Sequence, residues 1–178
     1  MKEVEVKIIE IDQKKVETKL KSLGAMKILD EDEETLFFDF PDHSISKAKN
    51  LLRLRRIGNK TALTFKKFVE SESAKIRDEY EMSVSDFGTA KMILKILGLN
   101  VTLQMEKHRI SYSLSGDVNV DIDKYTGQHS HIPALLEIEA SDASLIHKYA
   151  KLLGFEAEQC KSWTTFDLID YYSSKQAK

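Results

Sequence analysis

The chain has 178 residues, enough for one compact domain with a sizeable core and too few for two comfortably sized ones. Its 27 lysines and arginines nearly balance its 29 aspartates and glutamates, so we expect neither nucleic acid nor an anionic membrane as a partner. The single cysteine, Cys160, excludes an internal disulfide, and the lack of a leader-like or membrane-spanning apolar stretch predicts a cytoplasmic protein.

Eight segments alternate polar and apolar residues with a period of two, which is typical of strands with one buried face. They cover residues 3–9, 36–40, 51–57, 62–67, 77–84, 104–113, 117–123 and 135–140. Gly58-Asn59 and Ser115-Gly116 lie between consecutive segments and are typical of hairpin turns. We therefore predict eight strands, mostly joined antiparallel. The acidic run of residues 30–34 is predicted to be a solvated loop.

Four helices are predicted between and after these strands. They cover residues 12–23, 85–97, 141–154 and 162–172, and most begin at a capping Asp or Ser and end at a glycine. The polar tail of residues 173–178 is predicted to be frayed. No linker rich in proline, glycine or serine interrupts the chain, so residues 1–172 are predicted to form a single domain.

Charged residues occupy one side of the predicted strands, because residues two apart on a strand share a face. The acids there are Glu3, Glu5, Glu79, Glu81, Asp121, Asp123, Glu137 and Glu139, and the bases are Lys7, Arg53, Arg55, Lys66, Lys107 and Arg109. An ordinary wet sheet face would explain any single strand. After the first strand, however, acids and bases lie on separate strands. This segregation predicts two walls, one for metal ions and one for an anion.

So many charges cannot be buried without partners. A water-filled lumen removes that cost if arginines bind phosphate oxygens and carboxylates bind Mg²⁺ or Mn²⁺. The interior of an eight-stranded barrel has a suitable width for one small ligand. We therefore predict an α+β fold: a closed eight-stranded antiparallel β-barrel with a polar lumen and amphipathic helices packed outside.

Six short motifs occur in an order that matches a known family. They are EVEVK at residues 3–7, LRLR at 52–55, LTFK at 63–66, RDEYE at 77–81, KHR at 107–109 and LEIEA at 136–140. With these motifs the chain resembles the CYTH superfamily of triphosphate tunnel metalloenzymes, which includes class IV adenylyl cyclases and thiamine triphosphatases. KSW at residues 161–163 is similar to the KSY element of the cyclase branch. The GQHSHIP loop at 127–133 differs from the glycine-rich turn of that branch, so the cyclase is kept as an alternative.

The resemblance implies a closed triphosphate tunnel and roles for particular residues. The implied metal ligands are Glu3, Glu5, Glu137 and Glu139, with Asp121 or Asp123 as the metal-side aspartate. The implied catalytic and phosphate-binding residues are Lys7, Arg53, Arg55, Lys66, Lys107 and Arg109. Arg77 and Lys161 are further candidates for substrate binding.

The predicted function is cleavage of a nucleoside or organic triphosphate with Mg²⁺ or Mn²⁺. The candidate substrates are ATP, other nucleoside triphosphates, thiamine triphosphate and tripolyphosphate. One alternative is a class IV-type adenylyl cyclase, which makes cyclic AMP and pyrophosphate from ATP. Another is a non-catalytic module that binds polyphosphate or nucleotide, although a pure binder has no need of the acids. A homodimer is compatible with the sequence.

Several conspicuous residues are not assigned to the site. His129 and His131 have no third metal ligand near them in the sequence. His108 lies on the opposite face to Lys107 and Arg109 and is expected outside the tunnel. Cys160 has no neighbouring base to activate it, and Trp163 is expected to pack a helix against the barrel.

Overall fold

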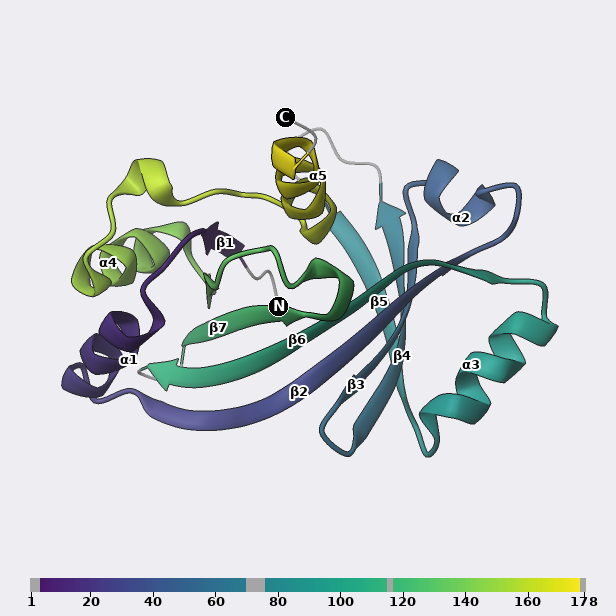
Figure 1. Cartoon of the computed structure of the whole chain (residues 1–178), viewed down its shortest axis with the longest axis horizontal. Coiled ribbons are helices and arrows are strands. Elements are labelled where there is room, and N and C mark those ends of the chain that lie inside the picture. The colour runs from purple at the N-terminus through teal and green to yellow at the C-terminus, as the bar shows by residue number, and fades with distance from the viewer. Residues whose placement is uncertain (1–3, 70–75, 115–116, 177–178) are drawn as a thin grey trace. The chain divides into compact units, whose positions relative to one another are not determined.

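The computed structural model describes residues 4–69, 76–114 and 117–176 (Figure 1). Its elements are β1 (Val4–Ile8), α1 (Gln13–Ser22), β2 (Met26–Asp39), α2 (Ser44–Lys47), β3 (Leu51–Ile57), β4 (Lys60–Val69), β5 (Ile76–Val84), α3 (Phe87–Ile96), β6 (Asn100–Leu114), β7 (Val118–Thr126), η1 (Gly127–His129), β8 (Leu135–Ala140), α4 (Ala143–Leu153), η2 (Ala157–Gln159) and α5 (Thr165–Gln176). Each predicted strand overlaps an observed strand, and each predicted helix overlaps an observed helix. No helix within the described ranges has the length and apolar character needed to cross a membrane.

The strands form one eight-stranded antiparallel sheet in the order β1-β8-β7-β6-β2-β3-β4-β5. The prediction of a closed barrel is wrong for this structure: over the residues that it describes, the sheet ends at β1 and β5. On the edge of β1 away from β8, the backbone N–H and C=O of Lys7 both bond to Lys161, with N···O distances of 2.8 and 2.9 Å. The backbone groups that a closing strand would need at Lys7 are therefore already paired.

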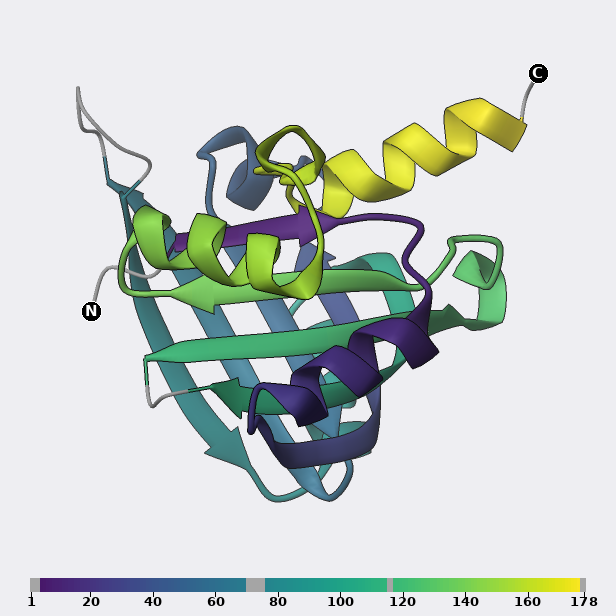
Figure 2. The same cartoon turned by 90° about the vertical axis from the view of Figure 1, so that its left-hand side faces the viewer.

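The chain divides into two compact units, and β2 and β6 each run through both. The first unit comprises Met1–Glu31 and Lys107–Lys178. In it the apolar faces of the strands pack against α1 and α4, with Ile8, Leu20, Ile138 and Ile146 all nearly inaccessible to solvent. Figure 2 shows the two helices on the same side of these strands. This packing leaves the polar face of β1, β6, β7 and β8 on the other side.

The second unit is Asp32–Glu106. Its core consists of Leu36, Phe38 and Leu54 from the strands together with Phe87 and Leu94 from α3. α3 contacts β3 and covers the apolar face of the strands in this unit (Figure 1). Arg53 and Arg55 of β3 alternate with Leu54 and therefore lie on the opposite face of the sheet, whereas Arg56 lies on the same face as Leu54.

Aspartates begin three of the helices. The side chain of Asp12 accepts a hydrogen bond from the backbone N–H of Lys15 at 3.2 Å and caps α1. Asp86, and not the expected Ser85, caps α3, and Asp142 caps α4. A longer reach and a charge that suits the positive end of a helix favour aspartate over the preceding serine at these two positions.

The acidic run of residues 30–34 is not the predicted loop, because it lies inside β2. Its carboxylates have partners on neighbouring strands. Asp30 lies 2.8 Å from Nε2 of His108, and Glu34 accepts from Arg56 at 2.8 Å. Glu33 is buried and faces the polar side of the sheet. Asp30, Glu31 and Asp32 are exposed, so this part of the run is solvated as predicted, but its backbone belongs to a strand.

α5 continues to Gln176, past residue 172, where the predicted helix ended. The hydroxyl of the buried Tyr172 donates to Oε1 of Glu10 at 3.0 Å. Nζ of Lys175 lies 3.2 Å from the same oxygen. These two contacts hold the last turns of the helix against the segment that follows β1.

Candidate functional site

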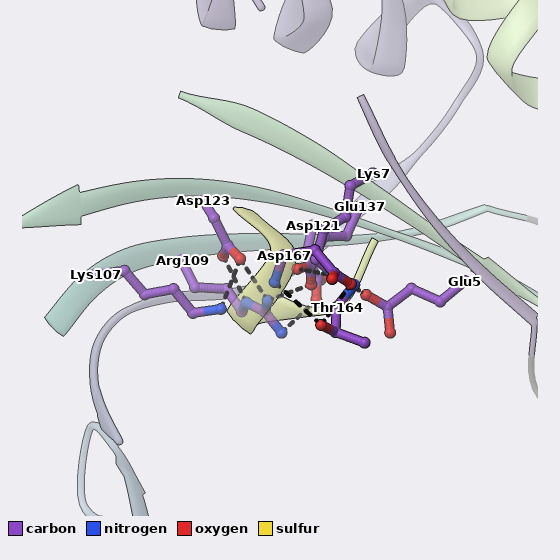
Figure 3. A network of polar contacts seen from close by, with 9 residues as sticks. All are labelled: Glu5, Lys7, Lys107, Arg109, Asp121, Asp123, Glu137, Thr164 and Asp167. Atoms are coloured by element: carbon purple, nitrogen blue, oxygen red, sulfur yellow. Dashed lines mark hydrogen bonds and ion pairs between the residues drawn. The ribbon is translucent and has the colours of Figure 1, made fainter. Parts of the chain in front are cut away.

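In the first unit, six predicted site residues lie in one connected network, shown in Figure 3. We call it the Arg109 cluster, and it consists of Lys7 on β1, Lys107 and Arg109 on β6, Asp121 and Asp123 on β7, and Glu137 on β8. The four strands are consecutive in the sheet. The charged residues that the sequence places on one face of these strands therefore form a contiguous patch of three cations and three carboxylates.

Arg109 is the centre of this cluster. Its Nε and Nη2 donate to the two oxygens of Asp123 at 2.7 and 2.6 Å, its Nη2 also donates to Glu137 at 2.5 Å, and its Nη1 lies 2.7 Å from Asp121. Burial alone would lower the pKa of Arg109, but Asp123 and Glu137 raise it well above its ordinary value. The guanidinium is therefore a fixed cation held by carboxylates on two strands.

The two lysines complete the network. Lys107 Nζ donates to the fully buried Asp123 at 2.6 Å. Lys7 Nζ pairs with Glu137 at 2.9 Å and also contacts Glu5. Burial would raise the pKa of Glu137, but the charges of Lys107, Arg109 and Lys7 lower it. A phosphate or a metal ion entering this network would have to exchange partners with groups that already satisfy one another.

Asp121 and Asp123, which the sequence leaves as alternatives for one role, differ in the structure. Asp123 is shared by Lys107 and Arg109 and is inaccessible to solvent. Asp121 is paired with Arg109 and is partly exposed. Burial raises the pKa of Asp121, although Arg109 and Ser111 oppose that change. Asp121 is therefore the more accessible of the two, and its carboxyl is protonated more easily than that of an ordinary aspartate.

Glu5 and Glu139 face each other across β1 and β8. The backbone N–H and C=O of Lys7 point away from β8 and bond to Lys161. Lys7 and Glu137 therefore form a non-hydrogen-bonded pair of the β1–β8 ladder, and so do Glu5 and Glu139 two residues away. Side chains approach each other closely in such pairs. Two carboxylates opposed in this way repel unless a cation lies near them.

These carboxylates fit the predicted Mg²⁺ or Mn²⁺. Such ions are usually held by one or two carboxylates together with substrate phosphates and water. Within residues 4–69, 76–114 and 117–176, no three Asp, Glu, His or Cys side chains gather into a metal-binding group. Glu3, a predicted ligand, lies outside the described residues. Asp121, Asp123 and Glu137 are directed at Arg109 instead.

The second unit holds another predicted set, which we call the Arg53 cluster: Arg53, Arg55, Lys66, Glu79 and Glu81. Lys66 Nζ lies 2.9 Å from Glu79, and Arg53 Nη2 lies 3.9 Å from the same carboxylate. Burial and the charge of Arg55 lower the pKa of Arg53. Nε of Arg53 is buried and donates to no described residue. A negatively charged oxygen at this position would both accept that N–H and reduce the repulsion between the two arginines.

The predicted separation into an acidic wall and a basic wall holds only in part. The acidic strands β7 and β8 are neighbours, and so are the basic strands β3 and β4, but strands of opposite sign also meet at two places. The acidic strand β7 lies beside the basic strand β6, and the acidic β5 lies beside the basic β4. Lys107–Asp123 and Lys66–Glu79 are the resulting ion pairs between neighbouring strands. At these two places, β6–β7 and β4–β5, unlike charges pair across neighbouring strands, which is the favourable arrangement.

Two predicted substrate-binding residues remain outside both clusters. Arg77 is paired with Phe68 in the register of β4 and β5, but its side chain is outside the described residues. Lys161 bonds to Lys7 through its backbone, and its ammonium lies 5.0 Å from the ring centre of Trp163. His108, which the sequence places on the other face, pairs with Asp30.

Ser111 and Tyr125 are neutral members of the same face and were not predicted from the sequence. Each lies two residues beyond a charged member, so one further step of the strand period would have found them. Ser111 hydrogen-bonds to Asp121. Tyr125 is buried under Lys107, whose Nζ lies 5.9 Å from the ring centre, and burial raises the pKa of Tyr125 to about 12. Neither side chain is charged in its usual state, so the pattern of charged residues does not include them.

Comparison with known proteins places this arrangement in a family. The profile of the CYTH domain matches residues 1–159. A Methanocaldococcus jannaschii protein whose name proposes an adenylate cyclase is 28% identical over 148 residues, which are 83% of this chain and 82% of that protein. The structure of a conserved hypothetical protein from Pyrococcus furiosus is 27% identical, with a TM-score of 0.73, and the match covers 94% of this chain and 99% of that one.

A Hippeastrum protein, described as an adenylyl cyclase candidate with a dominant triphosphatase activity, has a similar fold at 14% identity. The TM-score is 0.68, and the match covers 98% of this chain and 96% of that one. The domain profile covers most of the sequence, including all six motifs and both charged clusters. This chain therefore belongs to the CYTH family.

Proposed function

We propose that this protein is a divalent-metal-dependent enzyme that binds a nucleoside or organic triphosphate and hydrolyses its phosphate chain. Proteins of the CYTH family bind triphosphate substrates such as ATP and are generally enzymes. In this chain, the observation that carries the proposal is the Arg109 cluster, in which cations and carboxylates from four neighbouring strands occupy one polar patch.

The proposed phosphate-binding residues are those whose chemistry suits phosphate oxygens. Arg53 supports this role because its buried Nε has no acceptor among the described residues and its neighbour Arg55 carries the same charge. Lys66 extends this set in the second unit, and Lys7, Lys107 and Arg109 supply cations in the first. During cleavage the oxygens of the phosphate chain gain charge, and cations fixed by carboxylates stabilise that charge without having to reorganise.

Mg²⁺ or Mn²⁺ is the proposed cofactor, with Glu5 and Glu139 as the residues that would hold it. When bound, such an ion offsets phosphate charge and polarises the phosphate oxygens. Lys7 contacts Glu5 and Glu137, so it would position these two carboxylates and reduce the repulsion between them. Glu137 lies beside this pair in the register of β8 and is the next candidate for a ligand.

Adenylyl cyclase is the second candidate. The name of the Methanocaldococcus jannaschii relative supports it, as does the KSW element at residues 161–163. In a cyclase the ribose 3′-hydroxyl of ATP, in place of water, would attack the α-phosphorus and release pyrophosphate. Hydrolysis is placed first because the Hippeastrum protein is described with a dominant triphosphatase activity and because the GQHSHIP loop departs from the cyclase branch.

Product analysis tests these assignments. The purified protein is incubated with ATP, thiamine triphosphate or tripolyphosphate, with Mg²⁺ or Mn²⁺ and in excess chelator. We expect phosphate or pyrophosphate release that stops in chelator and returns when metal is added. Cyclic AMP with pyrophosphate would select the cyclase, and turnover that continues in chelator would contradict the metal assignment. Binding of tripolyphosphate without any product would leave only the non-catalytic binder.

A further inference from the structure

Tyr125 is a buried tyrosine beside the Arg109 cluster. It lies on β7 two residues after Asp123 and four after Asp121, so it shares their face of the sheet. Tyr125 is 2% exposed, and Nζ of Lys107 lies 5.9 Å from the centre of its ring. The ring of His129 packs edge-on against it, with 6.5 Å between the ring centres. The packing around Tyr125 therefore fixes the position of its hydroxyl.

The hydroxyl of Tyr125 is inaccessible to solvent and has no hydrogen-bond partner among the residues that the structure describes. Buried hydroxyl groups are nearly always hydrogen-bonded, because burying one without a partner costs free energy. Burial is the main cause of the raised pKa of this phenol, and the charges that modify it are those of Lys107, Asp123, Glu137 and Lys7. The hydroxyl is therefore close enough to the Arg109 cluster to be influenced by its charges, yet it takes no part in the hydrogen bonds of that cluster.

The surroundings of this hydroxyl favour a negatively charged acceptor. A phenol is protonated at neutral pH, so Tyr125 can donate a hydrogen bond there but cannot act as a base. The nearby carboxylates of Asp123 and Glu137 already accept from cations of the cluster. Lys7 and Lys107 would attract a further anion, and a hydroxyl donates most strongly to a charged oxygen. A phosphate oxygen is therefore the acceptor that suits this position best.

We propose that Tyr125 is a substrate-binding residue whose hydroxyl donates a hydrogen bond to an oxygen of the bound phosphate chain. The inference rests on the proposed function, because it adds a residue to the same site. A hydroxyl adds a hydrogen bond without adding charge, and this one has its acceptor only when the ligand is bound. Removing it should therefore weaken binding of the ligand without weakening the fold of the free protein. A purely structural tyrosine would not show that combination.

Tyr125→Phe tests the proposal, with Tyr112→Phe as the matched control. Tyr112 is 1% exposed, and its hydroxyl also has no partner among the described residues. It lies in the hydrophobic core, however, on the other face of β6 from Lys107 and Arg109. Thermal melts measure the stability of the free proteins. Calorimetric titration with tripolyphosphate at about 0.15 M salt measures binding, in excess chelator so that the proposed hydrolysis does not occur.

Both free variants should be at least as stable as the wild type, because neither change removes a hydrogen bond to another described residue. Tyr125→Phe should bind tripolyphosphate about 10-fold more weakly than the wild type, whereas Tyr112→Phe should bind it equally well. Equal binding by Tyr125→Phe and the wild type would overturn this inference and leave the proposed function intact.

A Tyr125→Phe protein that is less stable than the wild type without ligand would also overturn the inference alone. The hydroxyl would then have a partner inside the protein, such as a buried water molecule. A wild-type protein that binds no tripolyphosphate, with or without Mg²⁺, would overturn the proposed function together with this inference.

Discussion

At the scale of single residues, the charged side chains of the Arg109 cluster are held by one another and not by solvent. Glu137 shows this best, because its carboxylate accepts from Arg109 at 2.5 Å and lies 2.9 Å from Lys7, with only 12% of its side chain exposed. Its lowered pKa has the same cause. Such a carboxylate contributes to the fold as well as to the proposed site.

Glu137→Gln is therefore expected to reduce the free energy of unfolding by about 3 kcal/mol, since removing one partner of a largely buried pair leaves the other charge uncompensated. Urea denaturation at neutral pH measures this loss. The control is Glu34→Gln, whose pair with Arg56 is more exposed and should be worth less than about 1 kcal/mol. If the two variants lost similar amounts of unfolding free energy, the ion pairs of Glu137 would stabilise the fold no more than those of a surface acid. Turnover by Glu137→Gln should also fall.

The same carboxylate predicts a dependence on pH. The folded pKa of Glu137 lies below its ordinary value of 4.5, so its stabilising contribution is present above that value and is lost as the pH falls through the lower, folded pKa. Asp121 acts in the opposite direction, because burial raises its pKa. The free energy of unfolding should therefore decrease from about pH 5 to about pH 3, with a shallower slope in Glu137→Gln. Equal slopes would contradict the assignment.

At the scale of elements, Asp39 determines how β2 ends and α2 begins. Its carboxylate accepts from the backbone N–H groups of Phe40, Ile45 and Ser46 at 2.8, 3.0 and 3.0 Å. Only 3% of the surface of Asp39 is exposed to solvent. α2 has only four residues and begins after His43, whose backbone is left-handed, so these three hydrogen bonds contribute much of what holds it in place.

Asp39→Ala should lower the free energy of unfolding by about 2–4 kcal/mol, because it leaves three backbone donors without their acceptor. Asp39→Asn, which keeps one oxygen, should lose less. Urea denaturation of the two variants gives both values. The account of this corner would be contradicted by an alanine variant as stable as the wild type.

Local periodicity predicted where strands and helices lie, but it could not predict which strands are neighbours. The strands that carry Arg53, Lys107 and Glu137 could be predicted because the alternation of polar and apolar residues is a property of adjacent residues. The strand position of Asp30 and Glu34 was missed because their partners, His108 and Arg56, are distant in the sequence. The open edges of the sheet and the meeting of acidic with basic strands were not predicted for the same reason, since both depend on the order of strands.

At the scale of the whole molecule, the central proposal is that the charged face of the strands binds a phosphate chain. An ordinary wet sheet face would have the same period-two pattern, but its cations would make little difference to ligand binding. The second unit offers a matched comparison on one strand. Arg53 and Arg55 lie on the charged face, whereas Arg56 lies on the other face and pairs with Glu34 at 2.8 Å.

The most direct measurement is a thermal melt with and without tripolyphosphate at about 0.15 M salt, where weak surface attraction is screened. The proteins are the wild type, Arg53→Ala/Arg55→Ala and Arg56→Ala. At 100 times the dissociation constant, tripolyphosphate should stabilise the wild type by about 2.7 kcal/mol, and Arg56→Ala should keep that gain. The double variant should lose most of it. Equal ligand-induced shifts in all three proteins would contradict the claim that this face binds the triphosphate.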